Sequence, residues 1–596
     1  MYSTDPVQPT LRRRIARGVW RGLWHVVVDG IAPLALPLWL VRRAGAALLA
    51  SPQTRTAAPL FFSRGDAQGE SWFYWWLHRA VTTGVPIDRP DVVCAPGGIG
   101  LGNNFGTRVD AWMAYPFFDR WPFPESFNLA VLSVPVVNAW LAWLGLRLMG
   151  AAPPVAVLGG SVLGVSAYVL DEITKGRSAN ALVGFAVALL GSMVAVRRGR
   201  LAAVPVAAGA AALTVLAYPP FALLVAPVAG ALLLSTAWTD PRLRRRALVG
   251  GALVSLCAIA TAWGYANALG AAGFSRATPV DGQEWKRLAQ DSLPWSWPWL
   301  EAVRTTPLTF GEHETWFSPW LAAGAALAFL VAGRGRRAST AGWIAVALGC
   351  WVATLGAFVL TRTGASTTVV RYDGAPLALP LRYALDLAPT LTQVRPYRFA
   401  PFVAMGLVFA MAAASRGSAW RSVLTAAVLA WALVQTERTG RLFVTWQPWR
   451  VPASVQRIAA IPGPFAILEL PAGGGHAYGA MQAYHQKARS ESHHDHHARI
   501  RAGGDAPRDC YTDPLARVLW DIDQGKPAPD DLSALARTAV AAGFHYLVVY
   551  RGAYASPAGY HRTMATLRAS LGSPTLEDGD GALFTLADQG AGPTLQ

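Results

Sequence analysis

The chain has 596 residues, of which 53% are hydrophobic and only 15% are charged. Soluble domains carry about 25% charged residues, so this composition excludes an ordinary soluble protein and predicts a membrane protein. The formal net charge of +17 is also typical of proteins that bind nucleic acid. Here, however, the arginines form short clusters between apolar runs rather than one basic face, which favours a role in membrane orientation.

The apolar runs predict a mainly α-helical, polytopic membrane protein with about eleven transmembrane helices, because about 20 residues cross the hydrocarbon core. Residues 1–10 are polar, so no cleavable leader is expected and the first span is expected to stay as an anchor. The expected spans are 24–48, 127–148, 154–170, 180–196, 201–217, 221–237, 248–270, 318–333, 341–361, 399–414 and 418–436.

Five arginine clusters set the expected orientation. With the amino terminus in the cytoplasm, all five clusters fall on the cytoplasmic side, as the positive-inside rule requires. The long connections 49–126, 271–317 and 362–398 then lie outside, together with the carboxyl-terminal region. The clusters are Arg12/Arg13/Arg14, Arg197/Arg198/Arg200, Arg242/Arg244/Arg245/Arg246, Arg334/Arg336/Arg337 and Arg416/Arg421.

The composition changes near the end of the last span, which predicts two domains, a transmembrane domain over 1–436 and an outer α/β domain over 437–596. In the second domain, strands are expected at 465–471, 545–551 and 582–586, and helices at 533–543 and 558–571. Within the loop 49–126, the aromatic run at 72–81 predicts a short helix in the membrane interface, with its Trp and Tyr rings at headgroup depth.

Four cysteines are too few for a disulfide scaffold. Cys257 and Cys350 lie in apolar runs and are expected to be core residues. Cys94 and Cys510 both fall on the outer side, where either a long-range disulfide or two unpaired thiols is compatible with the sequence.

Asp66 and Glu70 stand directly before the aromatic run, on the outer side. A carboxylate at Asp66 is well placed to act as a general base for a substrate that arrives from the membrane. The alternative is a solvated loop acid paired with Arg64. Glu70 either shares the site or caps the helix that begins near Ser71.

A second acid pair, Asp171 and Glu172, ends the third expected span. Acids at the membrane surface are costly unless they are solvated, paired or used. Lys175 and Arg177 are near in sequence, so one interpretation is a local ion-pair cluster. The other is a phosphate or metal site built from both signs of charge, because a departing phosphate needs cationic donors or a divalent ion.

The segment RPYRF begins the tenth expected span and places Arg395 and Arg398 three residues apart. On a helix they share a face, where guanidinium groups match phosphate oxygens; the alternative is interfacial anchoring. In the run HHDHH at 493–497, His493 has a helical spacing to His496 or His497 that suits a transition metal. No zinc-enzyme signature surrounds the run, so a solvated loop is expected and no metal ligand is assigned. No phosphate loop or dinucleotide motif is present.

These features together resemble the GT-C-fold membrane glycosyltransferases, which use polyprenyl-phosphate-linked sugars outside the membrane. The chain is most similar to poorly characterised bacterial members with WFYWWLHRA (72–80), APGGIG (95–100), RPYRF (395–399), LELP (468–471) and YLVVYR (546–551) segments and an outer α/β tail. It departs from them at KARSESHHDHHARI, which lacks a Gly-rich stretch, and at DEITKGRSAN, which lacks a histidine.

The resemblance implies a hexosyl or pentosyl transferase in the bacterial cytoplasmic membrane that inverts the sugar. The catalytic residues would be Asp66, Asp171 and Glu172. Asp66 would take the proton of a cell-envelope glycan, lipid or protein acceptor, and Asp171 would help bind the acceptor or a divalent cation. The substrate-binding residues would be Glu70, Lys175, Arg177, Arg395 and Arg398. The alternative function is a noncatalytic assembly or transport component, or a pseudoenzyme, whose outer domain binds a partner; the outer position of most acids and the absence of a repeat favour the enzyme.

Overall fold

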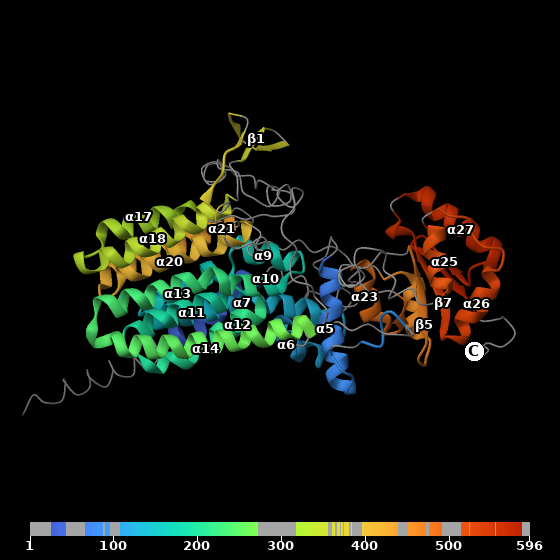
Figure 1. Cartoon of the computed structure of the whole chain (residues 1–596), viewed down its shortest axis with the longest axis horizontal. Helices are drawn as coiled ribbons and strands as arrows, with labels where there is room; N and C mark the ends of the chain where they lie inside the picture. Colours follow the sequence, from blue (N-terminus) through green and yellow to red (C-terminus); the bar gives the residue numbers. More distant parts are fainter. Residues whose placement is uncertain are drawn as a thin grey trace, which may run out of the picture.

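The structure is a computed structural model of the whole chain. It describes residues 26–42, 66–87, 90–95, 108–271, 318–355, 360–363, 366–369, 371–373, 375–380, 383, 396–438, 451–471, 476–490, 514–523, 525–554 and 556–586. Figure 1 shows long helices side by side in a bundle, with an α/β module at the other end of the molecule. Helix α5 (Asp66–Thr83) stands between the two and packs against both α6 (Val109–Phe118) and α23 (His476–His485).

The bundle is built from helices rich in Ala, Val and Leu, whose apolar side chains pack on one another over most of their length. Two short two-stranded pairs follow α18: β1 (Leu360–Thr363) with β2 (Ser366–Val369), and β3 (Arg371–Tyr372) with β4 (Ala375–Pro376). The bundle helices are α2 (Ala32–Leu40), α7 (Glu125–Met149), α8 (Pro153–Gly164), α9 (Ala167–Thr174), α10 (Ser178–Ala181), α11 (Gly184–Arg197), α12 (Val204–Ala217), α13 (Pro219–Thr239), α14 (Pro241–Ala271), α17 (Pro319–Val331), α18 (Arg334–Thr354), α20 (Ala400–Ser415) and α21 (Ala419–Arg438).

Close backbone packing joins α7, α8 and α11. A Cβ atom added at Gly164 would lie 2.5 Å from the backbone nitrogen of Ala139, and one added at Gly191 would collide with the backbone of Gly145. Small residues at helix crossings are typical of membrane helices, because van der Waals contact replaces the hydrophobic drive between them. The sequence therefore brings these three helices together through glycine.

A helix lies in each of the eleven expected ranges, but fewer helices satisfy the length and hydropathy of a membrane span. Among the described residues, four do so, and a bent pair, broken by 41° between its two helices, could make a fifth. The chain thus has membrane-protein character, while the count of about eleven spans stays a prediction. The four are Glu125–Met149, Ser178–Arg197, Pro241–Asn267 and Pro396–Ser415, and the bent pair is Pro153–Gly164 with Ala167–Ile173.

Arginines from four of the five predicted clusters gather at one end of the bundle, which we call the basic end. It is formed by the end of α11, the start of α14, the start of α18 and the turn between α20 and α21. The neighbouring pairs are Gly150 with Arg198 and Arg416, Gly199 with Arg246, Gly333 with Arg421, and Gly417 with Arg336. The clusters therefore share one end, as a common membrane side requires; Arg12 to Arg14 lie outside the described residues.

The α/β module has a five-stranded sheet in the order β6-β5-β7-β9-β8. The pairs β5–β6 and β5–β7 are parallel, whereas β9 is antiparallel to β7 and to β8. The expected strands and helices of this region are confirmed, and each helix begins and ends within two residues of its expected bounds. The strands are β5 (Ala466–Leu470), β6 (Ala488–Arg489), β7 (Phe544–Tyr550), β8 (Leu576–Glu577) and β9 (Gly581–Thr585).

Helices cover both faces of this sheet, since successive strand residues point to opposite sides. Leu468 and Val549 belong to one apolar core, and Ile467 and Val548 belong to another. The first core is closed by α25 (Pro514–Asp523), α26 (Leu532–Ala541) and α27 (Pro557–Leu571), and the second by α22 (Ala453–Ala460) and α23.

The expectation for the aromatic run was wrong in one respect. The run does form a helix, α5, but the rings of Trp72, Phe73, Tyr74, Trp75 and Trp76 are at most 5% exposed. They pack inside the protein, between the bundle and α23, so their faces are covered by protein and not by lipid headgroups. The aromatics therefore help to join the bundle to the α/β module.

A piece of the long loop also belongs to the junction with the α/β module. Residues 92–95 run beside β6, with Arg489 N donating to Val92 O at 3.0 Å and Ala95 N donating to Arg489 O at 2.8 Å. Cys94 in this segment is disulfide-bonded; Cys510, the partner considered from the sequence, lies outside the described residues. Cys257 and Cys350 are free thiols; the sequence placed them in the core, but both are only partly buried.

Candidate functional site

A buried cluster of charges lies where α5 meets α6. Glu70 and Tyr74 are four residues apart and so share a face of α5. Arg108, just before α6, forms ion pairs with both Glu70 and Asp110. The Tyr74 hydroxyl donates to Asp110 Oδ2 at 3.0 Å and lies 3.5 Å from Glu70 Oε1. We call Glu70, Tyr74, Arg108 and Asp110 the acid–arginine cluster.

This cluster holds two carboxylates for one guanidinium group, and the two acids differ in the direction of their pKa shifts. Burial raises the pKa of Glu70 well above its ordinary value; the charge of Arg108 acts against this increase, and the charge of Asp110 adds to it. Burial also acts to raise the pKa of Asp110, but Arg108 and the hydrogen bonds to Asp110 reverse this and lower it. The two acids are coupled, so the cluster holds Asp110 as the carboxylate and favours a proton on Glu70.

A second polar group lies at the same end of the bundle, around Glu172 of α9. The Tyr397 hydroxyl donates to Glu172 Oε1 and Asn180 Nδ2 donates to Glu172 Oε2, both at 3.1 Å. Arg398 Nε donates to the Tyr397 hydroxyl at 3.2 Å, and its guanidinium group lies 4.7 Å from the centre of the Tyr218 ring. Tyr397 thus stands between an acid and a guanidinium group that the chain separates by more than two hundred residues.

The short helix α10 lies between these two groups. Ser178 lies close to Tyr74 of the acid–arginine cluster, and Asn180, two residues later, contacts Glu172. Asn138 fixes this helix, because its Nδ2 donates to Ala181 O at 2.6 Å and its Oδ1 accepts from Gly184 N at 2.8 Å. The two groups therefore form one polar region at the end of the bundle opposite the basic end, beside α9 and α10 in Figure 1.

The structure places the residues selected from the sequence unequally. Glu70, Glu172 and Arg398 are buried in the polar region. Asp171 forms the local ion pair considered as an alternative, with Lys175 Nζ 2.6 Å from its carboxylate. Arg177 donates its backbone N–H to Glu172 O at 2.8 Å.

The side chains of Asp66 and Arg395 lie outside the part of the chain that the structure describes. Asp66 is the first residue of α5, one turn before Glu70, and its side chain lies outside the described part. Arg395, like the run at 493–497, falls outside the described residues. Both remain predictions as site residues.

Several residues of the polar region were not identified from the sequence. Arg108 and Asp110 form an R-x-D pair at the start of α6, which is a common pattern for a loop ion pair. Tyr74 is one of five consecutive aromatic residues, so nothing in the sequence distinguishes it from its neighbours. Tyr397 lies between Arg395 and Arg398, and only the arginines were selected. The available signal was the R-x-D pair, because it opens an apolar helix after a glycine-rich stretch, where two charges need a partner.

The chemistry of the polar region suits oxygen-rich substrates. It offers carboxyl groups, tyrosine hydroxyls and guanidinium groups at the end of an apolar bundle. Among the described residues, no group of three or more His, Cys, Asp or Glu is arranged to hold a metal ion. A divalent cation therefore stays a prediction.

Comparisons with known proteins give limited guidance. No protein-family model matches the chain, and no curated protein matches it. A cryo-EM structure of the arabinofuranosyltransferase AftD from Mycobacteria aligns over 92% of this chain, with 16% sequence identity and a TM-score of 0.48, and a mutant of the same protein aligns with a TM-score of 0.44. The chain spans 40% and 41% of those two structures. At these values the likeness says nothing about activity.

Proposed function

We propose that the chain is an integral-membrane glycosyltransferase that moves a sugar from a polyprenyl-phosphate carrier to a cell-envelope acceptor. The observation that carries the proposal is the acid–arginine cluster, buried at the end of the bundle opposite the basic end. Buried charges are costly in a membrane protein and mark functional sites by default. The motif resemblance described above supports the same reaction class.

In this proposal Asp66 is the general base. The acceptor hydroxyl oxygen attacks the anomeric carbon of the sugar, the bond from that carbon to the carrier phosphate oxygen breaks, and the hydroxyl proton passes to Asp66. A single displacement of this kind inverts the anomeric centre. Glu70 and Asp110 hold Arg108 and thereby fix the first turn of α5, which carries Asp66.

The departing phosphate is the group that needs positive charge. Arg398 and Arg395, at the start of α20, are proposed to bind its oxygens, together with Lys175 and Arg177 on the segment after α9. Glu172 and Asp171 are proposed to bind the acceptor or a divalent cation. Glu172 already accepts a hydrogen bond from Tyr397, so acceptor and phosphate would meet across this tyrosine.

The proposed orientation has the amino terminus in the cytoplasm and the region 437–596 outside, as a domain distinct from 1–436. The shared basic end supports this orientation. A membrane-impermeant maleimide tests it: Ala534→Cys, exposed on α26, should react in intact cells, and Ala419→Cys, exposed at the start of α21, should react only after permeabilisation. The reverse pattern would overturn the orientation.

Activity is tested with purified full-length protein in lipid nanodiscs and a panel of polyprenyl-phosphate hexoses and pentoses. Asp66→Asn should lower turnover at least about a hundredfold, the scale expected for loss of a general base. The matched control is Asp119→Asn, an exposed acid after α6, which should retain turnover within about twofold. Equal turnover in Asp66→Asn would remove Asp66 from the mechanism, and no transfer by native protein from any donor would favour the noncatalytic alternative.

A further inference from the structure

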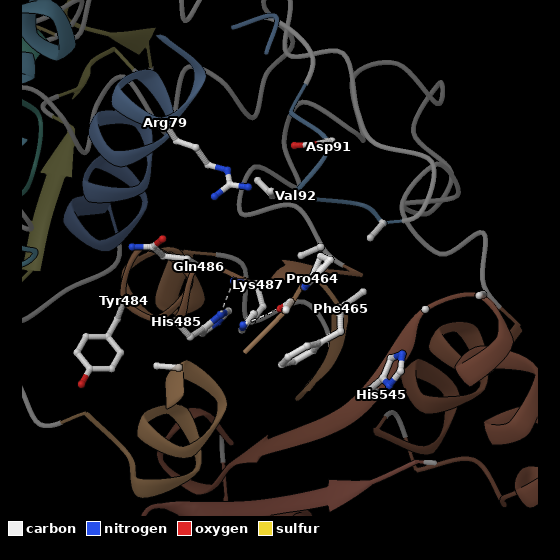
Figure 2. A pocket seen from close by; sticks show the side chains of 17 residues that line it. Arg79, Asp91, Val92, Pro464, Phe465, Tyr484, His485, Gln486, Lys487 and His545 are labelled. Carbon is white, nitrogen blue, oxygen red and sulfur yellow. Dashed lines mark hydrogen bonds between the residues drawn. The ribbon is translucent and has the colours of Figure 1, made fainter. Parts of the chain in front are cut away.

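A large cavity lies away from the polar region, between α5 and the α/β module. Its volume is about 750 Å³, within the range of about 300–1,000 Å³ that is typical of small-molecule sites. Figure 2 shows Arg79 reaching from α5 toward the end of α23, where His485 is the last helical residue and Lys487 lies in the turn that follows. Phe465 and His545 line the side formed by the sheet.

His485 lines this cavity, and its ring is buried in the wall. Its Nδ1 accepts a hydrogen bond from Lys487 N at 3.0 Å, so the proton of the neutral ring must lie on Nε2. Burial, assisted by Arg489 and Lys487, lowers the pKa of His485 to about 3, so the ring is neutral near pH 7. His485 is 2% exposed, and its Nε2 has no hydrogen-bond partner among the described residues. The neutral imidazole therefore adds no positive charge to the wall of the cavity.

Two cationic side chains set the charge of the cavity wall. Arg79 lines the cavity, and Figure 2 shows its guanidinium group reaching from α5 toward Lys487. Lys487 Nζ donates to Ile461 O at 2.6 Å and to Gly463 O at 3.0 Å, which fixes the ammonium group and leaves its third N–H. The cavity therefore collects donors on positively charged groups, which favours an oxyanion.

The size and the other lining residues indicate what carries the oxyanion. The cavity is far larger than a phosphate ion, so the anion must be part of a larger molecule. Gln486, Asp91 and Tyr484 offer polar groups for hydroxyls, and Phe465 offers an aromatic ring. Aromatic and mixed polar linings of this kind suit a sugar ring. Asp91 is exposed at the edge, where it disfavours a highly charged polyanion.

We propose that this cavity binds a sugar that bears a carboxylate or a phosphate, held between Arg79 of α5 and the His485–Lys487 turn of the α/β module. The proposal stands apart from the transferase activity and from the acid–arginine cluster. In this proposal the α/β module binds a ligand of its own, and Arg79 is the residue of α5 that contacts this ligand.

The test uses full-length protein in nanodiscs of neutral lipid, with isothermal titration calorimetry. Digalacturonate, glucose 6-phosphate and neutral maltose are the probes, and they distinguish a carboxylate from a phosphate as the bound group. At least one anionic probe should bind about tenfold or more tightly than maltose. Equal affinity for all three, or no binding of either anionic sugar, would overturn the proposal.

Variants then locate the site. Arg79→Gln should weaken binding of the anionic probe at least about tenfold, whereas Arg120→Gln, which removes an exposed arginine after α6, should change it less than about twofold. Lys487→Gln is the second variant if Arg79→Gln does not fold. In native protein the bound probe should also slow amide hydrogen exchange at 463–466 and 485–488. Protection elsewhere, with unchanged affinity in the folded variant, would place the ligand at another site.

Discussion

Arg108 and Arg489 are two guanidinium groups that the fold removes from water beside carboxylates, and they differ in their surroundings. Arg489 lies inside the α/β module, 2.6 Å from Glu469, and neither side chain has exposed surface. Tyr550 donates to the same carboxylate at 2.8 Å. Arg108 lies at the end of the helix bundle, is 18% exposed, and contacts both Glu70 and Asp110.

The comparison separates a structural ion pair from a cluster with chemical capacity. In the α/β module, burial raises the pKa of Glu469, while Arg489 and Tyr550 act against this. In the acid–arginine cluster, two acids compete for Arg108, so the pKa of Glu70 is raised by burial while that of Asp110 is lowered. A cluster that can hold or release a proton near a substrate is useful, whereas a matched pair mainly fixes the fold.

The largest effect is expected from Glu469→Gln. The change leaves Arg489 buried without the carboxylate it contacts, and a guanidinium group cannot lose its charge. The free energy of unfolding should fall by about 3–5 kcal/mol, measured by denaturant unfolding followed by fluorescence of the α/β module. Glu577→Gln is the control, because Glu577 pairs with Arg568 on the surface, where the loss should not exceed about 1 kcal/mol. Similar losses in the two variants would erase the contrast between the buried pair and a surface one.

Arg108→Gln should have a smaller and pH-dependent effect. The variant leaves two carboxylates without their cation. A carboxylate can bind a proton and become neutral, whereas a guanidinium group stays charged, so this loss is smaller than the one expected for Glu469→Gln. We expect a loss of about 2–4 kcal/mol at pH 8 and a smaller loss at pH 5, measured by thermal unfolding in nanodiscs. Arg120→Gln should change stability by at most about 0.5 kcal/mol. A loss that does not depend on pH would show that Glu70 and Asp110 do not titrate with Arg108.

Tyr74→Phe and Tyr550→Phe form a matched pair of hydroxyl deletions. Tyr74 donates to Asp110 and Tyr550 to Glu469, so each variant removes one hydrogen bond to a buried acid. Each should cost about 1–2 kcal/mol of unfolding free energy. If Tyr74 belongs to the active site, its variant should also lower transfer in the nanodisc assay, while Tyr550→Phe should not.

Glu70→Gln should have the smallest effect on stability. Because the folded-state pKa of Glu70 lies above its ordinary value, the folded protein keeps a proton over a pH range in which the unfolded chain has lost it. Stability therefore falls as the pH rises through that range, and glutamine, which resembles the protonated acid, removes this fall. We expect a change within about 1 kcal/mol at pH 5 and a relative gain at pH 8. A steeper loss with pH in the variant would contradict the assignment.

Local pattern predicted much of the α/β module. Strand β5 and strand β7 are short apolar runs between turn residues, and Gly543 closes α26 with a φ of 94°, a conformation that glycine adopts freely. Each of these signals lies within a few residues, so no distant contact was needed to recognise it.

The polar region could be predicted only in part, because it depends on contacts between distant segments. Glu172 was selected for its place at a span end, but its partner Tyr397 is 225 residues away. Glu70 was selected as a neighbour of Asp66, while Arg108, 38 residues away, reaches it only in the folded chain. Periodicity could not tell that the α5 aromatics face the protein, because a ring in lipid and a ring in a core have the same pattern.

Helix α5 carries both Glu70 of the acid–arginine cluster and Arg79 of the cavity, so one helix sets the relative direction of the two side chains. Glu70 and Arg79 are nine residues apart, which is about 14 Å along the helix axis, and each extra residue turns everything after it by about 100°. An alanine inserted after Leu77 would leave the amino-terminal half of α5 in register and rotate Arg79 away from the cavity that it lines with His485 and Lys487. Both the identity of these two residues and the number of residues between them must therefore be kept. Insertions or deletions in α5 should be far less tolerated than substitutions at its exposed positions.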